Sequence, residues 1–285
     1  MDKNSNLSIR IMSRDELKNI AVAWAKAEGW NPGLYDADAF YTADNEGFFA
    51  GFLNEQPIAC VSLVKYNAEF AFLGFYIVKE EFRGQGYGIS IWKKAIESAG
   101  NCNIGLDGVP DQQSNYQKSG FNLEYSNIRF EGISKHRDLE NSCLLPLINV
   151  TFSELSAYDR QCFPANRDPF LQEWIGLPES AAFAYVEDQK LKGYTVIRKC
   201  GSGYKIAPLF ADDALIAEQL FQKVCNFIDE RSIIYLDVPE VNADAMGMVQ
   251  KYQMKEVFRT ARMYTGRAPE IALGKIFGVT SFELG

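Results

Sequence analysis

The sequence predicts an α/β protein of the α+β type, built from two similar units that each have a mixed, mostly antiparallel central sheet flanked by helices. Apolar runs of strand length alternate with segments of helical periodicity along the chain. The same order of elements occurs before and after a polar segment at residues 134–146. At 285 residues the chain is long enough for two domains. We place them at 1–133 and 147–285, with 134–146 as the linker.

The composition indicates a globular protein that binds neither nucleic acid nor membranes. Hydrophobic residues make up 47% and charged residues 23% of the chain. A net charge of −8 without a basic block is unfavourable for contacts with phosphate backbones. Residues 1–10 are polar, and no apolar run approaches the ~20 residues that a membrane span requires. We therefore expect a cytoplasmic protein, and the sequence leaves its oligomeric state open.

Cysteine and histidine usage argues against a metal site and against disulfides. The six cysteines are scattered without a C-x-x-C pair, and His136 is the single histidine. Cys60, Cys200 and Cys225 lie in apolar strand or helix patterns. We therefore expect these thiols to be buried and inert.

In the first unit, local signals mark the helices and apolar runs mark the strands. Ser13 is a good N-cap, and Glu16 completes a capping box for a helix that ends before Gly29. The expected elements, in order, are a strand at 8–12, helices at 13–28 and 36–42, strands at 48–53, 58–66 and 70–78, a helix with Ile89, Trp92, Ile96 and Ala99 on one face, a strand at 104–109, a short helix at 112–119 and a closing strand pair at 121–130.

A glycine-rich segment, Arg83-Gly84-Gln85-Gly86-Tyr87-Gly88, joins the strand at 70–78 to the next helix. Glycines at alternate positions remove the side chains that would hold a ligand away from the backbone. Free N–H groups at a helix N-terminus favour an anion. The segment therefore predicts a phosphate cradle. It lacks the lysine of a nucleotide-hydrolase loop, and its glycine spacing is not that of a dinucleotide-binding loop.

This loop and the order of elements around it resemble the GNAT acyltransferase superfamily. The pattern Arg-x-x-Gly-x-Gly at 83–88 follows the fourth strand, and Tyr116 with Gly120-Phe121 is similar to the Tyr-x-x-x-Gly-Phe ending of that superfamily. The segments 28–33 and 276–285 look like those of a bacterial branch of tandem GNAT proteins. The resemblance implies an N-acyltransferase of the N-acetyltransferase type, with acetyl-CoA or another acyl-CoA as co-substrate and no metal.

The second unit repeats this layout without the residues that carry chemistry. We expect a strand at 147–150, a helix capped by Ser153, strands at 182–186, 191–199 and 204–210, a helix containing Ile216, Leu220, Val224 and Phe227, a strand at 234–238, a helix from Asn242 and a last strand at 257–264. Asp212 and Asp213 stand where the glycine loop should be, and Val249 stands near the place of Tyr116. Two carboxylates would repel a pyrophosphate. We therefore expect a degenerate GNAT-like domain that binds no CoA and closes the acceptor pocket of the first domain.

The resemblance also implies roles for single residues of the first unit. Backbone N–H groups of Tyr76, Ile77 and Val78 would polarise the thioester carbonyl, and this strand edge would pair with the pantetheine. Tyr116 would protonate the leaving thiolate, and Asn115 would either bond the pantetheine or be solvated. The pyrophosphate would be held by Arg83, Gly84, Gln85, Gly86, Tyr87 and Gly88.

The base that deprotonates the acceptor is the least defined of these roles. The strand at 70–78 contains no acid, and Asp107 on the following strand is the candidate. However, Asp237 occupies the matching place in the degenerate unit, which suggests a structural task for both residues. A water relay to Glu28 or Asp36 stays open, as does a mechanism without a dedicated base.

We expect the acceptor to be the amine of a small molecule or peptide. The loop at 28–36 combines aromatic rings, Asn31 and carboxylates, a mixture that would suit an amine with an apolar part, although aromatic packing under a loop explains it equally well. The alternative function is an acyl-CoA-binding sensor or interaction module without turnover, which the undefined base motivates.

Overall fold

The structure, a computed structural model, describes residues 7–139 and 141–285. The first half contains β1 (Leu7–Ile11), a continuous helical segment of α1 (Arg14–Glu16), the π-helical η1 (Leu17–Val22) and α2 (Ala23–Ala27), then α3 (Asp36–Ala43), β2 (Phe48–Leu53), β3 (Gln56–Lys65), β4 (Phe70–Val78), η2 (Glu80–Phe82), α4 (Tyr87–Ala99), β5 (Asn103–Gly108), η3 (Pro110–Gln112), α5 (Gln113–Lys118) and β6 (Asn122–Ile133). The second half contains β7 (Leu144–Pro146), η4 (Leu147–Asn149), α6 (Phe152–Cys162), α7 (Asp168–Trp174), β8 (Ser180–Glu187), β9 (Lys190–Lys199), β10 (Tyr204–Ala211), α8 (Ala214–Phe227), β11 (Ile233–Pro239), α9 (Ala243–Lys251), β12 (Lys255–Tyr264), η5 (Leu273–Lys275) and β13 (Ile276–Gly278).

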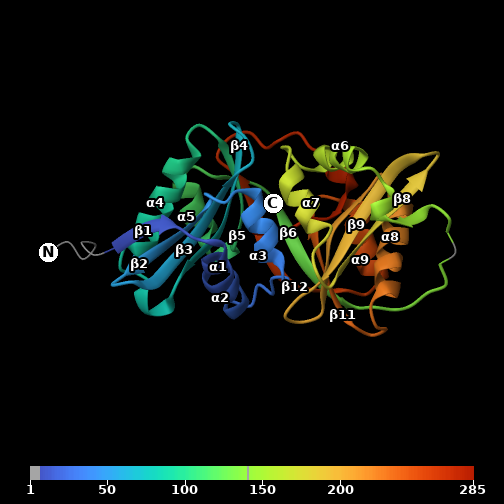
Figure 1. Cartoon of the computed structure of the whole chain (residues 1–285), viewed down its shortest axis with the longest axis horizontal. Helices are drawn as coiled ribbons and strands as arrows, with labels where there is room; N and C mark the ends of the chain where they lie inside the picture. Colours follow the sequence, from blue (N-terminus) through green and yellow to red (C-terminus); the bar gives the residue numbers. More distant parts are fainter. Residues whose placement is uncertain (1–6, 140) are drawn as a thin grey trace.

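Within the described residues, thirteen strands form one sheet with the order β1-β2-β3-β4-β5-β12-β6-β11-β10-β9-β8-β7, and β13 pairs with β10. Figure 1 shows two lobes, one on each side of β6 and β12. The described strand pairs are antiparallel except for β4 with β5 and β10 with β11. The structure therefore confirms the predicted fold class, a mixed and mostly antiparallel sheet flanked by helices.

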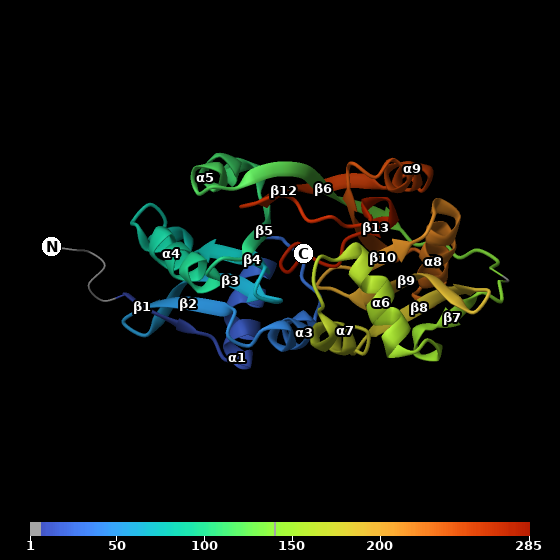
Figure 2. The same cartoon turned by 90° about the horizontal axis from the view of Figure 1, so that it is seen from above.

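The two halves exchange their last strands. β12 from the second half inserts between β5 and β6, and β6 from the first half pairs with β11 of the second. In Figure 2, β6 and β12 run side by side along one edge of the molecule, between α5 and α9. The part of the sheet in each half is completed by a strand of the other half. The domain boundaries at 1–133 and 147–285 therefore describe repeated units of the sequence, and they stay a prediction.

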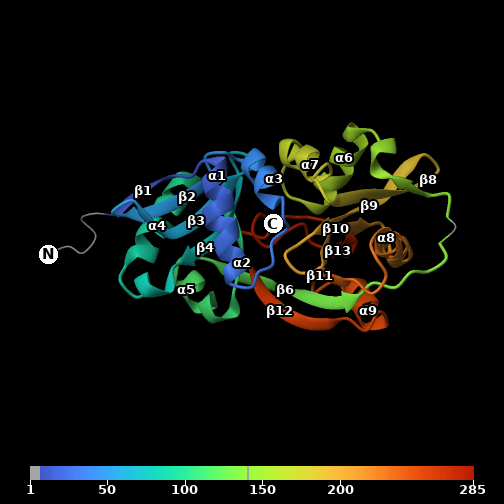
Figure 3. The same cartoon turned by 60° about the horizontal axis from the view of Figure 1, so that its bottom comes forward.

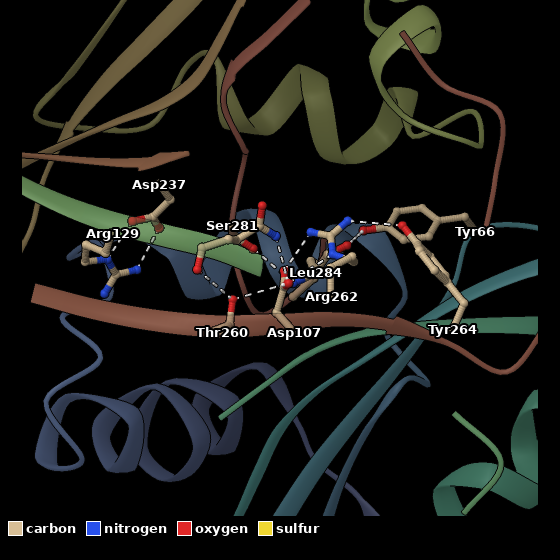
Figure 4. Close-up of polar contacts among 10 residues, drawn as sticks. Tyr66, Asp107, Arg129, Asp237, Thr260, Arg262, Tyr264, Ser281 and Leu284 are labelled. Carbon is tan, nitrogen blue, oxygen red and sulfur yellow. Dashed lines mark hydrogen bonds and ion pairs between the residues drawn. The ribbon is translucent and has the colours of Figure 1, made fainter. Parts of the chain in front are cut away.

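A buried arginine–aspartate pair lies on each exchanged strand. Arg262 on β12 faces Asp107 on β5, with Nη2 2.6 Å from Oδ2 and side chains that are 7% and 0% exposed. Arg129 on β6 faces Asp237 on β11, with Nε 2.7 Å from Oδ1. Figure 4 shows both pairs along the two neighbouring strands. Asp107 and Asp237 therefore have the same structural role, since each pairs with an arginine on an exchanged strand, as their equivalent places in the sequence suggest.

The last residues of the chain lie between the two lobes. β13 pairs with β10, and the following residues 279–285 are buried. Figure 3 shows this end of the chain in the centre of the molecule. The hydroxyl of Tyr66 on the first lobe donates to the carbonyl oxygen of Leu284 at 2.8 Å. Residues from both halves also share one apolar core, in which Phe40 stacks on Trp174 with ring centroids 5.9 Å apart.

Most predicted elements are confirmed, and some differ from the prediction. The capping box of Ser13 and Glu16 is present. The expected strand pair at 121–130 is wrong, because β6 is a single strand that pairs with β11 and β12 on its two sides. Helix α7 and strand β13 were not expected from the sequence. On α4, Ile91 is buried and Ile89 is 51% exposed, which corrects the predicted apolar face.

At the start of the second half, two predictions are wrong. Residues 147–149 form a 3₁₀ helix, and the strand lies before them at 144–146. Thr151 caps α6 in place of Ser153, because Thr151 and Glu154 form a complete capping box.

Two expectations from composition concern the thiols and the membrane. Cys60, Cys200 and Cys225 are buried free thiols, as predicted. Over residues 7–139 and 141–285, no helix is long and apolar enough to cross a membrane.

Because strands are exchanged between the halves, we expect Asp237→Asn to lower the stability of the protein strongly. The substitution leaves the buried Arg129 guanidinium without its counter-charge, which costs about 3–5 kcal/mol of unfolding free energy. Arg129 and other cations lower the pKa of Asp237 against the effect of burial, so this stabilisation is present above the unfolded pKa near ~3.9 and is lost as the pH falls below it. Urea unfolding at pH 7 measures the difference. Glu270→Gln is the control, because the Arg267–Glu270 pair is 85% and 83% exposed. Equal midpoints for the two variants would contradict the prediction.

Candidate active site

One cavity of about 730 Å³ runs from the glycine loop to the junction of the two halves. We call its two regions the loop end and the junction end. The loop end is lined by Arg83, Gly84, Gly86 and Gly88. The junction end is lined by Trp30 of the first half and by Phe258, Thr260, Phe282 and Glu283 of the second. Between these ends the wall is formed by Leu73–Val78 of β4, Leu106–Gly108 of β5 and Tyr116 of α5.

The cavity exists because β4 and β5 separate. They pair in parallel only over Phe70–Leu73 and Asn103–Leu106, although β4 continues to Val78. Next to the separation, β4 carries a bulge in which Phe75 and Tyr76 face one residue of β3. Phe75 has φ of 46°, a left-handed conformation that is costly for a bulky residue and is typical of functional sites. The edge of β4 beyond Leu73 therefore has no pairing with β5, although the carbonyl oxygen of Val78 at its end accepts from Arg83 Nε.

The three glycines of the loop are required for two different reasons. Gly84 and Gly86 have φ of 71° and 88°, in the left-handed region that favours glycine. Gly88 has an ordinary φ, but a Cβ there would lie 2.6 Å from the hydroxyl oxygen of Tyr76. Gly86 is the N-cap of α4 and provides no side-chain cap. In the described part of the chain, the N–H groups of Gly84, Gln85 and Gly86 have no acceptor, so they are available to an anion.

The loop's polar side chains are bound to neighbouring protein groups. Arg83 donates from Nε to the carbonyl oxygen of Val78 at 2.8 Å and from Nη2 to Oε1 of Glu28 at 2.7 Å. Gln85 donates to the carbonyl oxygen of Glu81 at 2.8 Å. The loop groups that are left available to an anion are therefore mainly the backbone amides.

Three predicted binding residues do not line the cavity. Gln85 points back to Glu81, and the buried ring of Tyr87 packs edge-on against Phe82 with centroids 6.2 Å apart. Asn115 donates to Oε1 of Gln112 at 2.8 Å. By contrast, Tyr76, Ile77 and Val78 all line the cavity, and their role in carbonyl polarisation stays a prediction.

Tyr116 lies on the cavity wall beside β5. Its ring stacks on Trp92 with centroids 5.6 Å apart, and Gly108 lies so close that a Cβ there would collide with the tyrosine ring. The hydroxyl has no hydrogen-bond partner among the described residues. Burial, together with the nearby Tyr76, raises the pKa of Tyr116 to about 12. This phenol is a hydrogen-bond donor at every physiological pH.

Asp107 lines the cavity, but its carboxylate is already occupied. Oδ1 accepts from Asn127 Nδ2 at 2.8 Å and from Arg262 Nε at 3.0 Å, and Oδ2 accepts from Arg262 Nη2 at 2.6 Å. Thr260 Oγ1 lies 3.4 Å from Oδ1 (Figure 4). A carboxylate with both oxygens in charge-assisted bonds is a poor proton acceptor, so the geometry gives no support to Asp107 as the base.

The other two acids considered as relays differ in position. Glu28 lines the cavity and pairs with Arg83. Asp36 is buried outside it, where its carboxylate accepts from Arg198 Nε at 2.7 Å and from the N–H of Gly33 at 2.8 Å. Asp36 therefore serves the contact between the halves and has no access to the cavity.

The second half has filled its corresponding groove. β10 and β11 pair only over Tyr204–Ile206 and Ile234–Leu236, and β13 pairs with β10 beyond that point. Asp213 caps α8, because its carboxylate accepts from the N–H of Ile216 at 2.9 Å. The protein's own strand and carboxylate thus occupy the places that a ligand's chain and anion would take.

The junction-end residues of the second half were not found from the sequence. Phe258 and Thr260 reach the cavity because β12 crosses into the first half, and Phe282 and Glu283 reach it because the chain end returns to the centre. They lie about 170 or more positions after the glycine loop in the sequence. No local pattern marks such distant pairings.

The chain matches known acyltransferases along both halves. The model of the acetyltransferase (GNAT) family matches residues 14–121, and that of an acetyltransferase (GNAT) domain matches residues 155–278. Holothin acyltransferase from Pseudoalteromonas sp. (strain SANK 73390) is 30% identical over 262 residues, covering 92% of this chain and 89% of that protein.

Solved structures share the fold. The crystal structure of a protein described as an acetyltransferase from Pyrococcus horikoshii aligns with a TM-score of 0.83 at 20% identity, over 99% of this chain and 96% of that one. A tandem GNAT protein from the clavulanic acid biosynthesis pathway aligns with a TM-score of 0.65 at 12% identity, over 92% and 99%. The chain therefore belongs to the GNAT family: it is an acyltransferase with two GNAT domains, and the co-substrate of this family is an acyl-CoA.

The loop geometry predicts that Gly86→Glu abolishes tight binding of acyl-CoA. The variant places a side chain at φ of 88° and a negative charge beside the pyrophosphate. We expect at least about a hundredfold weaker binding of acetyl-CoA, or about 2.7 kcal/mol, measured by calorimetry. Gly274→Glu is the matched control, because a Cβ at this glycine meets nothing within 4 Å and its φ is not positive. Unchanged affinity in the Gly86 variant would remove the loop from the donor site.

Proposed function

We propose that this GNAT enzyme is an N-acyltransferase that moves an acyl group, with acetyl-CoA as the donor, to the amine of a small molecule or peptide. One observation carries the proposal: a single cavity joins the amide-rich loop to a junction end that combines carboxylate and aromatic side chains. A cationic amine with an apolar part is complementary to such a surface. The relative named for holothin supports a defined acceptor molecule rather than a protein surface.

The donor would be held by backbone groups. The free N–H groups of Gly84, Gln85 and Gly86, at the N-terminus of α4, would bind the pyrophosphate. The unpaired edge of β4 would continue as a ladder with the pantetheine amides. At the bulge, N–H groups of Tyr76 to Val78 would donate to the thioester carbonyl oxygen as negative charge develops on it.

Tyr116 would stabilise the leaving sulfur. With a phenol pKa of about 12, full proton transfer to a thiolate whose conjugate acid has a pKa near ~8.5 is uphill by roughly 5 kcal/mol. The hydroxyl therefore donates a hydrogen bond to the sulfur while the C–S bond breaks, and the thiolate then takes the proton that the amine nitrogen loses when the amide forms. This is stabilisation of a developing charge in the transition state.

The proposed acceptor class is tested by thiol release from acetyl-CoA. A panel pairs aromatic and aliphatic primary amines with alcohols of the same shape. We expect turnover with amines that carry an aromatic group and background rates with the alcohols. Turnover with alcohols alone would contradict N-acylation. Replacing acetyl-CoA by longer acyl-CoA donors in the same assay tests the acyl group.

Tyr116→Phe should slow turnover without weakening donor binding. We expect kcat to fall about 10²-fold or more and the Kd of acetyl-CoA to stay within a factor of about two. Because the phenol stays protonated below pH 12, the wild-type rate should show no alkaline fall between pH 7 and 10. Tyr204→Phe on β10, outside the cavity, is the control. A weaker Kd with an unchanged kcat would assign Tyr116 to binding alone.

A further inference from the structure

We propose that Glu283, which the second half delivers into the cavity, binds the ammonium group of the acceptor and takes a proton from it, so that the neutral amine can attack the thioester. The inference rests on the proposed N-acyl transfer and names the residue that recognises the acceptor. It arises from a comparison of the carboxylates that line the cavity, which are Glu28, Asp107, Asp111 and Glu283.

Glu283 lies beside the reactive part of β4. Its backbone packs on Gly74, where a Cβ would collide with the carbonyl oxygen of Glu283. Gly74 directly precedes the bulge at Phe75, at which the thioester carbonyl would be bound. Glu283 is 3% exposed and still lines the cavity, so its accessible surface faces the cavity. The acceptor and the thioester would therefore meet between Glu283 and β4.

Glu283 is the buried cavity acid that has no competing partner. Its carboxylate makes no hydrogen bond or ion pair with any residue in 7–139 or 141–285. Asp107 is saturated by Arg262, and Glu28 is paired with Arg83. Asp111 is exposed, so water already solvates it. A buried carboxylate without a partner is costly unless a cation binds it, and an ammonium from the cavity would be that cation.

Given the charges around Glu283, the cavity is the side from which a further cation can approach this residue. On the second-half side it interacts through space with three buried cations, Arg129, Arg198 and Lys205. Both arginines already have carboxylate partners, Asp237 and Asp36. Burial, reinforced by Arg129, lowers the pKa of Lys205, while Glu283 and Asp237 act against this shift.

Both sides of Glu283 are anchored. Before it, the N–H of Val279 donates to the carbonyl oxygen of Asp237 at 2.8 Å, and Thr280 Oγ1 accepts from Arg167 at 2.9 Å. After it, the carbonyl oxygen of Leu284 accepts from Tyr66. β13, which fills the groove of the second half, therefore anchors the segment that positions the Glu283 carboxylate in the first half.

The step balances without a further reactant. The ammonium first gives one proton to the Glu283 carboxylate, which releases it to solvent. The lone pair of the neutral amine then attacks the thioester carbonyl carbon, and the C–N bond forms. The C–S bond breaks, and the electron pair leaves on sulfur, which Tyr116 stabilises. As the amide forms, the nitrogen loses its second proton, and this proton ends on the sulfur. The products are an amide, CoA thiol and one proton for each ammonium consumed.

The experiment compares Glu283→Gln with wild type across pH 6.5–10, using the best amine from the panel. We expect kcat/KM for the amine to fall about a hundredfold or more at pH 7. The deficit should shrink as the pH approaches the amine's own pKa, where the free base is already present. Glu270→Gln, on the exposed Arg267–Glu270 pair, is the matched control. Asp111→Asn tests the competing cavity acid.

The outcomes separate this inference from the proposed function. If the wild type turns over none of the amines, the proposed function itself is contradicted. If the wild type is active, three results would overturn the role of Glu283. These are an unchanged pH profile of kcat/KM in Glu283→Gln, a deficit in kcat/KM that stays constant with pH, and a larger loss of kcat/KM in Asp111→Asn. Calorimetric binding of acetyl-CoA checks that the variant is folded. If Glu283→Gln does not fold, Glu283→Asp must show a reduced kcat/KM with a wild-type Kd for acetyl-CoA, and an unchanged kcat/KM in that variant overturns the inference.

Discussion

Each half of the sheet is completed by a strand of the other half, and a buried arginine–aspartate pair lies on each of these strands. β12 brings Arg262 to Asp107, and β6 brings Arg129 to Asp237. Two buried guanidinium groups tolerate no other register, because a shift by one residue would move each arginine to the opposite face of its sheet and leave both charges unpaired. This constraint makes the two lobes one body and places Phe258 and Thr260 at the cavity.

In the proposed reaction, the same constraint allows a half without the glycine loop to contribute residues to the cavity of the other half. In the second half, Asp213 supplies the anion at the helix N-terminus and β13 fills the groove between β10 and β11. In the first half the helix N-terminus is uncapped and the groove is open. The filled groove anchors residues 279–285, and this segment carries Phe282 and Glu283 into the open one. We propose that the two halves thus have complementary tasks, donor binding and support of the junction end of the cavity.

The sequence predicts what is local. The capping box at Ser13, the glycine loop and the acids at Asp212 and Asp213 act within a few residues of their own backbone, and their positions were found correctly. The loop's side chains were less predictable, because Arg83 and Gln85 bond to groups that the pattern does not show. The equivalence of Asp107 and Asp237 suggested a structural task, but their partners lie 155 and 108 positions away.

The junction end of the cavity could not be predicted, since its residues meet only through strand exchange and the return of the chain end. The central claim is that one cavity presents the donor at the glycine loop and the acceptor between β4 and Glu283. The most direct test is a structure of the protein with a bisubstrate analogue, in which CoA is joined through its sulfur to an aromatic amine by an acetyl linker. We predict the pyrophosphate on the amides of 84–86, the sulfur beside Tyr116 and the amine nitrogen within hydrogen-bond distance of Glu283. Binding of the analogue in the second half, or an amine that lies away from Glu283, would contradict the account.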